Sequence, residues 1–276
     1  RDKGLKAVRE ARHLLEQDGV QTSICLPFQP EIGYEIPEDI RLENIRQAAE
    51  SANLLICFGG DGTILHSAKL AAEYHIPILG VNMGSVGFMA ELEHSELKLL
   101  HRLVEGQYTC EKRMLMDVKV LRDKRVIYQD TALNDVTITR GAIGRVVDLA
   151  VYGDRVKIME CTGDGVIVAT PTGSTAYSMA AGGPIVEPTA ENLIITPICA
   201  HALQAKSFVL GPERIVAVRT SRQSRKTAYL SSDGGRAFRL NGGDVVEMCN
   251  SKRHIELVRL SGRNFYEIVS QKLGRN

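Results

Sequence analysis

The sequence predicts an α/β N-terminal domain followed by an all-β, β-sandwich-like C-terminal domain. Up to about residue 110, short apolar runs alternate with amphipathic helical patterns, whereas alternating apolar and polar residues dominate the rest of the chain. Hydrophobic residues make up 44% of the 276 positions, which is enough for a sizeable core. We therefore place the first domain at residues 1–110.

The first half begins with helical patterns. Residues 5–15 and 46–52 mix apolar and charged side chains at near-helical spacing, so we expect helices there. Residues 54–58 form a short apolar run that ends in glycines, a helical pattern follows at 63–74, and a second run, which contains proline, covers 76–81. Short apolar strands that alternate with amphipathic helices predict a parallel sheet covered on both faces.

The second half has the two-residue period of strands. Residues 114–121 and 147–152 alternate in this way, and the pair Gly153-Asp154 predicts a hairpin turn. A stretch of small residues at 173–183 interrupts the pattern, and we expect a short helix in it. Further strand-like runs cover residues 207–210, 215–219, 245–249 and 254–260.

Charge and composition exclude several classes of protein. The 34 basic and 33 acidic side chains nearly cancel, so bulk attraction to nucleic acid or to an anionic membrane is not expected. No apolar run approaches the roughly 20 residues that span a bilayer. The six cysteines contain no C-x-x-C pair, which favours a cytoplasmic protein over a disulfide framework or a zinc site. The chain opens at Arg1 directly into a helical pattern, which leaves open whether a first strand precedes it.

The segment FGGDGT at residues 58–63 lies between a predicted strand and a predicted helix. Free N–H groups and the positive end of the helix dipole face an anion at such a junction, although the spacing matches neither a Walker loop nor a Rossmann fingerprint. Asp61 would repel a phosphate unless it binds a metal ion or accepts the proton of an attacking hydroxyl, which makes it the candidate catalytic residue. Alternatively, Asp61 only caps the helix.

Four further segments follow this loop. They are GVNMGSVGFMAE at 80–91, LNDV at 133–136, DGVIVATPTGSTAYS at 164–178 and ITPICAHAL at 195–203. Together with the loop they resemble the NAD kinase family over about residues 50–270. The resemblance implies phosphorylation of the adenosine-ribose 2′-hydroxyl of NAD to give NADP, with ATP or polyphosphate as donor. It also implies an active site between the domains, a homodimer or homotetramer, and a C-terminal segment, 264–276, that returns to the first domain, which leaves 111–263 as the β-rich NAD-binding domain.

The resemblance assigns roles to individual residues. Asp61 corresponds to the catalytic aspartate, Phe88 is expected near the adenine, and Asn134 with Asp135 is expected to hold the nicotinamide nucleotide. Asp135 replaces the usual glutamate of the family, and His66 stands where arginine is common. The residues expected to bind substrate or cofactor are Gly59, Gly60, Gly62, Thr63, His66, Phe88, Asn134, Asp135, Arg145, Thr162, Asp164, Thr175, Ala176, Tyr177, Ser178, Met179 and Ala180.

Each of these segments also has a plain structural interpretation. The LNDV segment could simply shape a turn, and the Asp164-Gly165 pair could be an ordinary β-turn. Residues 172–178 could be only a helix N-terminus whose hydroxyls accept the first N–H groups. Phe88 and Tyr177, taken singly, are more often packing residues than ligand contacts.

Two rival functions share some of these features. Lipid kinases of the diacylglycerol or sphingosine type have the G-G-D-G-T loop, but they usually carry a G-T-x-N-D segment after it, where this chain has GVNMG at 80–84. A nucleotide-binding sensor on the same fold would leave Asp61 only structural. No cluster of metal ligands is visible in the sequence, so we expect a divalent cation, magnesium, to arrive with the donor phosphates.

Overall fold

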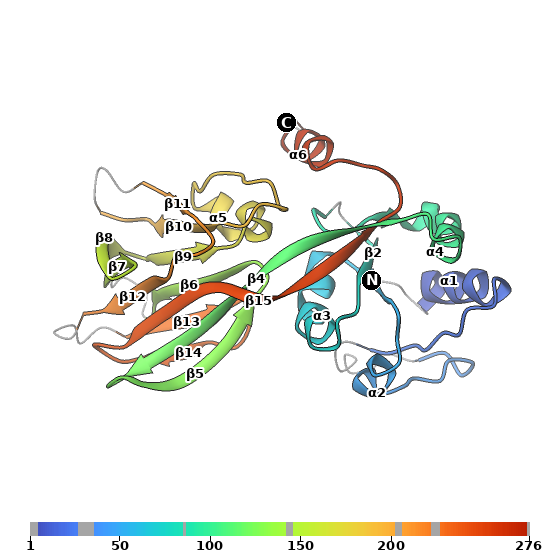
Figure 1. Cartoon of the computed structure of the whole chain (residues 1–276), viewed down its shortest axis with the longest axis horizontal. Helices are drawn as coiled ribbons and strands as arrows, with labels where there is room; N and C mark the ends of the chain where they lie inside the picture. Colours follow the sequence, from blue (N-terminus) through green and yellow to red (C-terminus); the bar gives the residue numbers. More distant parts are fainter. Residues whose placement is uncertain are drawn as a thin grey trace. The chain divides into compact units, whose positions relative to one another are not determined.

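The chain forms two compact units in a computed structural model (Figure 1). One unit contains Arg1–Lys112 and Ile255–Asn276, and the other contains Arg113–His254. No described helix is both long enough and apolar enough to span a membrane. The residues that the structure describes are 5–26, 36–84, 87–141, 146–201, 206–221 and 227–274.

The first unit is built on parallel strands, which confirms the predicted α/β class. Strand β2 (Ile78–Asn82) pairs in parallel with β1 (Leu55–Gly59) and with β3 (Leu92–Glu93). It also pairs in parallel with the end of β15 (Val245–Arg259). All five residues of β2 are buried, as expected for a strand with neighbours on both sides and helices on its faces.

Helices cover these strands. The helix α1 buries Ala7, Ala11 and Leu15, which are spaced four residues apart, in one cluster with Leu79 and Val81 of β2. Burial of a leucine side chain contributes roughly 1.5 to 3 kcal/mol, and burial of each alanine methyl contributes about 0.8 kcal/mol. The helices of this unit are α1 (Lys6–Gln17), α2 (Ile45–Ala49), α3 (Asp61–Tyr74), the 3-10 helix η2 (His94–Leu100), α4 (His101–Val104) and α6 (Phe265–Leu273).

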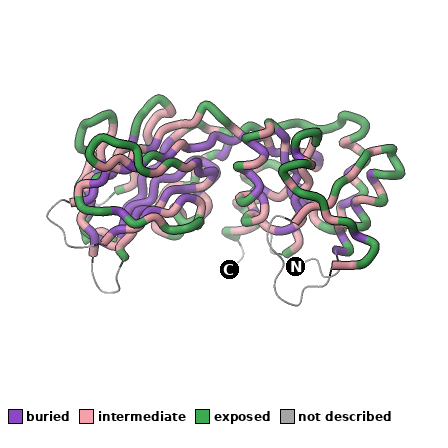
Figure 2. The backbone as a smooth tube through the Cα atoms, turned by 90° about the horizontal axis from the view of Figure 1, so that it is seen from below, coloured by how far each residue is buried: buried purple, intermediate pink, exposed green. Residues whose placement is uncertain are grey.

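The second unit contains two antiparallel layers, which confirms the predicted β-sandwich-like class. One layer has the order β11-β10-β9-β6-β13-β14, and the other contains β4, β5, β7, β8, β12 and β15. A single buried cluster draws Ile138 and Val168 from the first layer and Met116 and Val246 from the second. Figure 2 shows such buried stretches in the interior of each unit and exposed residues on the connecting loops. The strands are β4 (Thr109–Arg122), β5 (Arg125–Ala132), β6 (Asp135–Arg140), β7 (Val147–Gly153), β8 (Val156–Gly163), β9 (Gly165–Ala169), β10 (Leu193–Ile198), β11 (Phe208–Leu210), β12 (Val216–Thr220), β13 (Ala228–Ser232) and β14 (Phe238–Leu240).

Two local predictions differ from the structure. The hairpin between β7 and β8 turns at Asp154 and Arg155, whose φ angles are 49° and 72°, one residue later than predicted. Both residues take the left-handed region that a tight hairpin turn requires, and Ile215 N donates to Asp154 Oδ1 at 3.0 Å. The predicted runs 245–249 and 254–260 form the single strand β15, because backbone pairing continues through polar residues that carry no apolar alternation.

Candidate functional site

The glycine-rich loop lies where the sequence places it, between β1 and α3 of the first unit. Gly60 is the N-cap residue of the 14-residue helix α3 and has no side chain to occupy the first N–H groups. A Cβ on Gly59 would lie 2.1 Å from Thr63 Oγ1, so only glycine allows Thr63 this position. Gly62 is exposed, and a Cβ there would meet nothing within 4 Å. The junction therefore offers an open helix N-terminus, which favours a bound anion.

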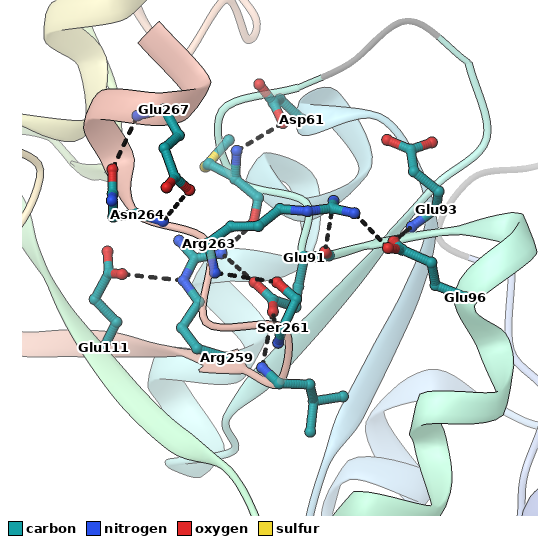
Figure 3. Close-up of polar contacts among 12 residues, drawn as sticks. Asp61, Glu91, Glu93, Glu96, Glu111, Arg259, Ser261, Arg263, Asn264 and Glu267 are labelled. Atoms are coloured by element: carbon teal, nitrogen blue, oxygen red, sulfur yellow. Dashed lines mark hydrogen bonds and ion pairs between the residues drawn. The ribbon is translucent and has the colours of Figure 1, made fainter. Parts of the chain in front are cut away.

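Asp61 is the first residue of α3, and backbone donors from a distant segment fix its carboxylate (Figure 3). Phe88 N donates to Oδ2 at 2.8 Å, and Met89 N donates to Oδ1 at 3.1 Å. A Cβ on Gly87 would lie 2.1 Å from Asp61 Oδ1, so glycine at this position is required for the close approach. The carboxylate thus faces residues 87–89 rather than the N–H groups of its own helix, which is not the arrangement of a helix cap.

Two other predicted residues of the first unit have different surroundings. Phe88 is partly buried, and the ammonium nitrogen of Lys272 in α6 lies 4.0 Å from the centre of its ring. His66 is exposed on α3. Phe88 therefore contacts the Asp61 carboxylate through its backbone N–H group and Lys272 of α6 through its ring.

In the second unit, the segment that contains Asn134 and Asp135 is held by the carboxylate of Asp233. Leu133 N donates to Asp233 Oδ2 at 2.8 Å, and the N–H groups of Asn134 and Asp135 donate to Oδ1 at 2.8 and 3.1 Å. Asp233 has a φ angle of 52°, which Asp tolerates better than most residues. Asn134 lies in the bend between β5 and β6, and Asp135 is the first residue of β6, so the turn of the plain interpretation includes Asn134 but not Asp135. The carboxylate of Asp233, not the side chains of this pair, holds the backbone of the bend.

The same segment also contacts the small-residue stretch. Thr170 N donates to Asn134 O at 2.9 Å, and Gly173 N donates to Thr170 Oγ1 at 3.2 Å. A Cβ on Gly173 would lie 1.9 Å from Asn134 O, so glycine is required here too. The structure therefore brings the LNDV segment and the start of the 3-10 helix η3 (Thr172–Thr175) together.

The polar groups of Asn134 and Asp135 are in unusual environments. Asn134 Oδ1 is buried and accepts no hydrogen bond from the described residues. Leaving a buried acceptor without a hydrogen bond lowers the stability of the fold by about 1 to 3 kcal/mol. A ligand that donates a hydrogen bond to this oxygen would recover that free energy. Burial, and secondly the negative charge of Asp233, raises the pKa of Asp135 to about 7. Asp135 can therefore change its charge near neutral pH.

The predicted residues Thr162 and Asp164 lie apart from Asp135. In the pairing of β6 with β9, Asp135 is opposite Ala169, whereas Asp164 precedes Gly165 at the other end of the pair. Asp164 forms an ion pair with Arg140, with Oδ1 2.6 Å from Nε. Thr162 Oγ1 donates to Asp148 Oδ1 at 3.0 Å. The structure therefore does not gather these residues with Asn134 and Asp135.

The predicted residues 175–180 form the end of η3 and the short helix α5 (Tyr177–Ala180). Ser178 is fully buried, and its Oγ lies 2.9 Å from Thr196 Oγ1. Thr175 Oγ1 donates to Thr172 O at 3.3 Å, and Tyr177 is 46% exposed. Ala176 and Met179 are partly buried, and Ala180 is exposed. Neither η3 nor α5 has a side-chain cap at its N-terminus, and the predicted Arg145 lies outside the described residues.

Three residues that position the site were not among the site residues expected from the sequence. They are Gly87 beside Asp61, Gly173 beside Asn134, and Asp233 under the LNDV segment. Gly87 and Gly173 stand inside segments that carry the resemblance, so their glycine identity was a usable signal. Asp233 acts across about 100 positions of sequence, and no local pattern points to that contact.

Comparisons with known proteins cover both units. A family profile described as the ATP-NAD kinase N-terminal domain matches residues 6–108, and one described as the ATP-NAD kinase C-terminal domain matches 133–260. An NAD kinase of Acetivibrio thermocellus is 36% identical over 274 residues, which cover 99% of this chain and 93% of that protein. An NAD kinase of Symbiobacterium thermophilum is 42% identical over 222 residues, 80% of this chain and 78% of that protein.

Solved structures share the fold. The structure of yeast NADH kinase complexed with NADH has a TM-score of 0.85 and 24% identity, and the match covers 100% of this chain and 85% of that one. An NAD kinase from Archaeoglobus fulgidus in complex with ATP has a TM-score of 0.72 and 23% identity, covering 98% and 95%. The two family profiles and the relatives above 30% identity show that this chain belongs to the NAD kinase family of phosphotransferases.

Proposed function

We propose that the enzyme transfers the terminal phosphoryl group of ATP or polyphosphate to the 2′-hydroxyl of the adenosine ribose of NAD, which gives NADP. The observation that carries this proposal is the fixed carboxylate of Asp61 at the N-terminus of α3, held by the N–H groups of Phe88 and Met89. A carboxylate has about four acceptor positions, so two hydrogen bonds leave capacity for a substrate hydroxyl.

The chemistry follows from this capacity. A ribose hydroxyl is a poor nucleophile, and a positioned carboxylate can orient it and accept its proton. In the transfer step the O2′–P bond forms, the bond from phosphorus to the leaving phosphate oxygen breaks, and the hydroxyl proton passes to Asp61. Because phosphoryl transfer requires little covalent chemistry from the protein, positioning of the reactants and stabilisation of charge supply most of the acceleration.

The loop at residues 59–63 is the part of the first unit that suits the donor phosphates, because the open N-terminus of α3 provides N–H groups and a positive dipole end. The described residues contain no group of three His, Cys, Asp or Glu side chains that could hold a metal ion. The described residues therefore offer no set of ligands for a magnesium ion held by the protein alone. We propose that the cation arrives bound to the donor phosphates, where it neutralises charge.

Asn134 and Asp135 are the part of the second unit that suits NAD. The buried Oδ1 of Asn134 is an acceptor without a protein partner among the described residues, and the hydroxyl and carboxamide groups of NAD are donors. ATP as donor agrees with the description of the matching profiles, ATP-NAD kinase. A polyphosphate donor, a cytoplasmic location and a homodimer or homotetramer remain predictions from the family resemblance.

The experiment that tests the proposal supplies the purified enzyme with NAD, magnesium and either ATP or polyphosphate. NADP is then measured with a dehydrogenase that accepts only the 2′-phosphorylated nucleotide. We expect NADP with at least one of the donors and no phosphorylation of diacylglycerol or sphingosine. If NADP fails to form with either donor while a lipid acceptor is phosphorylated, the proposal is wrong.

A further inference from the structure

The segment that holds Asp61 is itself fixed at a buried carboxylate. Glu91, two residues after Met89, is 3% exposed, and its N–H donates to Gly80 O at 2.9 Å. Glu91 Oε1 accepts from Leu260 N at 2.8 Å and from Ser261 N at 2.5 Å. A buried charge is costly unless it is paired and hydrogen-bonded, so these bonds define one position for Glu91.

Arg259 connects the same segment to Glu91 and to β4 (Figure 3). Its Nη1 donates to Met89 O at 3.2 Å and to Glu91 Oε2 at 3.3 Å, and its Nε donates to Glu111 Oε2 at 3.0 Å. The guanidinium group is planar and rigid, so three bonds to separate partners set its orientation. Residue 89 is therefore held from both sides, with its carbonyl bound to Arg259 and its N–H bound to Asp61.

We propose that Arg259 and Glu91 are positioning residues for catalysis, because they fix the segment 87–91 whose N–H groups orient the Asp61 carboxylate. This inference rests on the proposed role of Asp61. Replacing a buried ion pair with apolar residues of similar size is often neutral for stability, so we assign this pair a geometric role rather than a stabilising one. A misplacement of a catalytic group by about 1 Å is enough to lower the rate by about a hundredfold.

The test compares Arg259→Lys with a matched control, Arg102→Lys. Lysine at 259 keeps the positive charge, but its single ammonium group cannot reproduce the planar set of bonds to Met89 O, Glu91 and Glu111. Arg102 Nη1 donates to Leu260 O at 2.8 Å, a single bond that an ammonium group can also make, so the control replaces an arginine just beyond the end of β15 and leaves the bond from Arg259 to Met89 O in place. We measure kcat, the KM for NAD, the KM for the donor and the midpoint of thermal unfolding.

We expect kcat of Arg259→Lys to fall about tenfold to a hundredfold, with both KM values within about twofold and a thermal midpoint close to that of Arg102→Lys. An equal loss of kcat in the control, or a loss that appears only as a raised KM, overturns the positioning role. A pure stability effect lowers the midpoint of Arg259→Lys and leaves the kcat of the folded fraction unchanged, which also overturns it.

Glu91→Gln is the second variant and keeps the proposal testable if Arg259→Lys does not fold. The glutamine oxygen can still accept from Leu260 N and Ser261 N, but its amide donors face Arg259 Nη1 and repel it. The same selective loss of kcat is expected. Asp61→Asn separates the two proposals: an active Asp61→Asn removes the catalytic role and this inference with it. An inactive Asp61→Asn together with unchanged kcat in both Arg259→Lys and Glu91→Gln overturns only the positioning role.

Discussion

Both units hold a functional segment with an aspartate that accepts backbone N–H groups, but the aspartate has a different task in each. In the first unit Asp61 accepts from Phe88 and Met89 and is itself the candidate for the chemistry. In the second unit Asp233 accepts from three successive N–H groups and holds the backbone of Asn134 and Asp135, the residues proposed to contact NAD. The comparison teaches that an aspartate bonded to backbone N–H groups can either have its own carboxylate oriented by them, as at Asp61, or hold the backbone of another segment, as at Asp233.

The two candidate ligand-facing carboxylates differ in the same way. Asp61 is stabilised by donors, whereas Asp135 is buried beside another carboxylate, and its pKa rises to about 7. A raised pKa means that the folded state binds the proton more tightly than the unfolded state does. Below pH 3.8, the pKa of Asp135 in the unfolded chain, this group adds its full contribution to the free energy of unfolding. That contribution is lost as the pH rises through about 7, the pKa in the folded protein.

The largest expected effect concerns Asp135→Asn, which removes this titration. The free energy of unfolding of the natural enzyme should fall relative to that of the variant between about pH 4 and pH 8, by on the order of 4 kcal/mol. Urea denaturation at a series of pH values measures the difference. Parallel curves for the two proteins would mean that burial beside Asp233 does not raise the pKa of Asp135.

Gly87→Ala should have the next largest effect and act on the first unit alone. The added Cβ would lie 2.1 Å from Asp61 Oδ1, so either the carboxylate or the segment 87–89 must move. We expect kcat to fall about a hundredfold, equivalent to about 3 kcal/mol, with NAD affinity little changed. Gly19→Ala is the control for general strain in this unit, since Gly19 has a φ angle of 79° and open space around it. Similar kinetics in both variants would contradict the account.

Asp233→Asn should affect the second unit in the complementary way. Asparagine tolerates the φ angle of 52°, but it replaces one carboxylate oxygen with a donor that faces a backbone N–H group. We expect the KM for NAD to rise about tenfold, roughly 1.4 kcal/mol, while kcat at saturation changes little. Steady-state kinetics with NAD varied at saturating donor separate the two parameters. A loss confined to kcat would contradict the division of tasks between the units.

The smallest expected effect is that of Lys272→Met. The ammonium group 4.0 Å from the Phe88 ring centre makes a cation–π contact, and methionine keeps the apolar stem while losing the charge. Such contacts at accessible sites contribute about 0.5 to 1 kcal/mol, so kinetic parameters should change by no more than about fivefold. A loss as large as that of Gly87→Ala would show that α6 takes part directly in the reaction.

The sequence predicted the elements that depend on local pattern and missed the contacts that depend on tertiary structure. The loop at 59–63 is a strand, a turn and a helix start in one short segment, so its place in the fold was predictable. The partner of Asp61 lies 27 residues away and that of Asp233 about 100 residues away, and a single sequence carries no pairing information over such separations. The sequence predicted two strands where the structure has the single strand β15, because the polar residues in its middle interrupt the apolar pattern but not the backbone pairing.

The most direct measurement of the central claim is a single-turnover experiment on Asp61→Asn at saturating NAD and donor. Asparagine can occupy the same space but cannot take up the ribose hydroxyl proton. We predict that the rate of NADP formation falls by about two to four orders of magnitude while the Kd for NAD stays within about threefold. A variant that forms NADP at the natural rate would contradict the claim that this carboxylate carries out the chemistry.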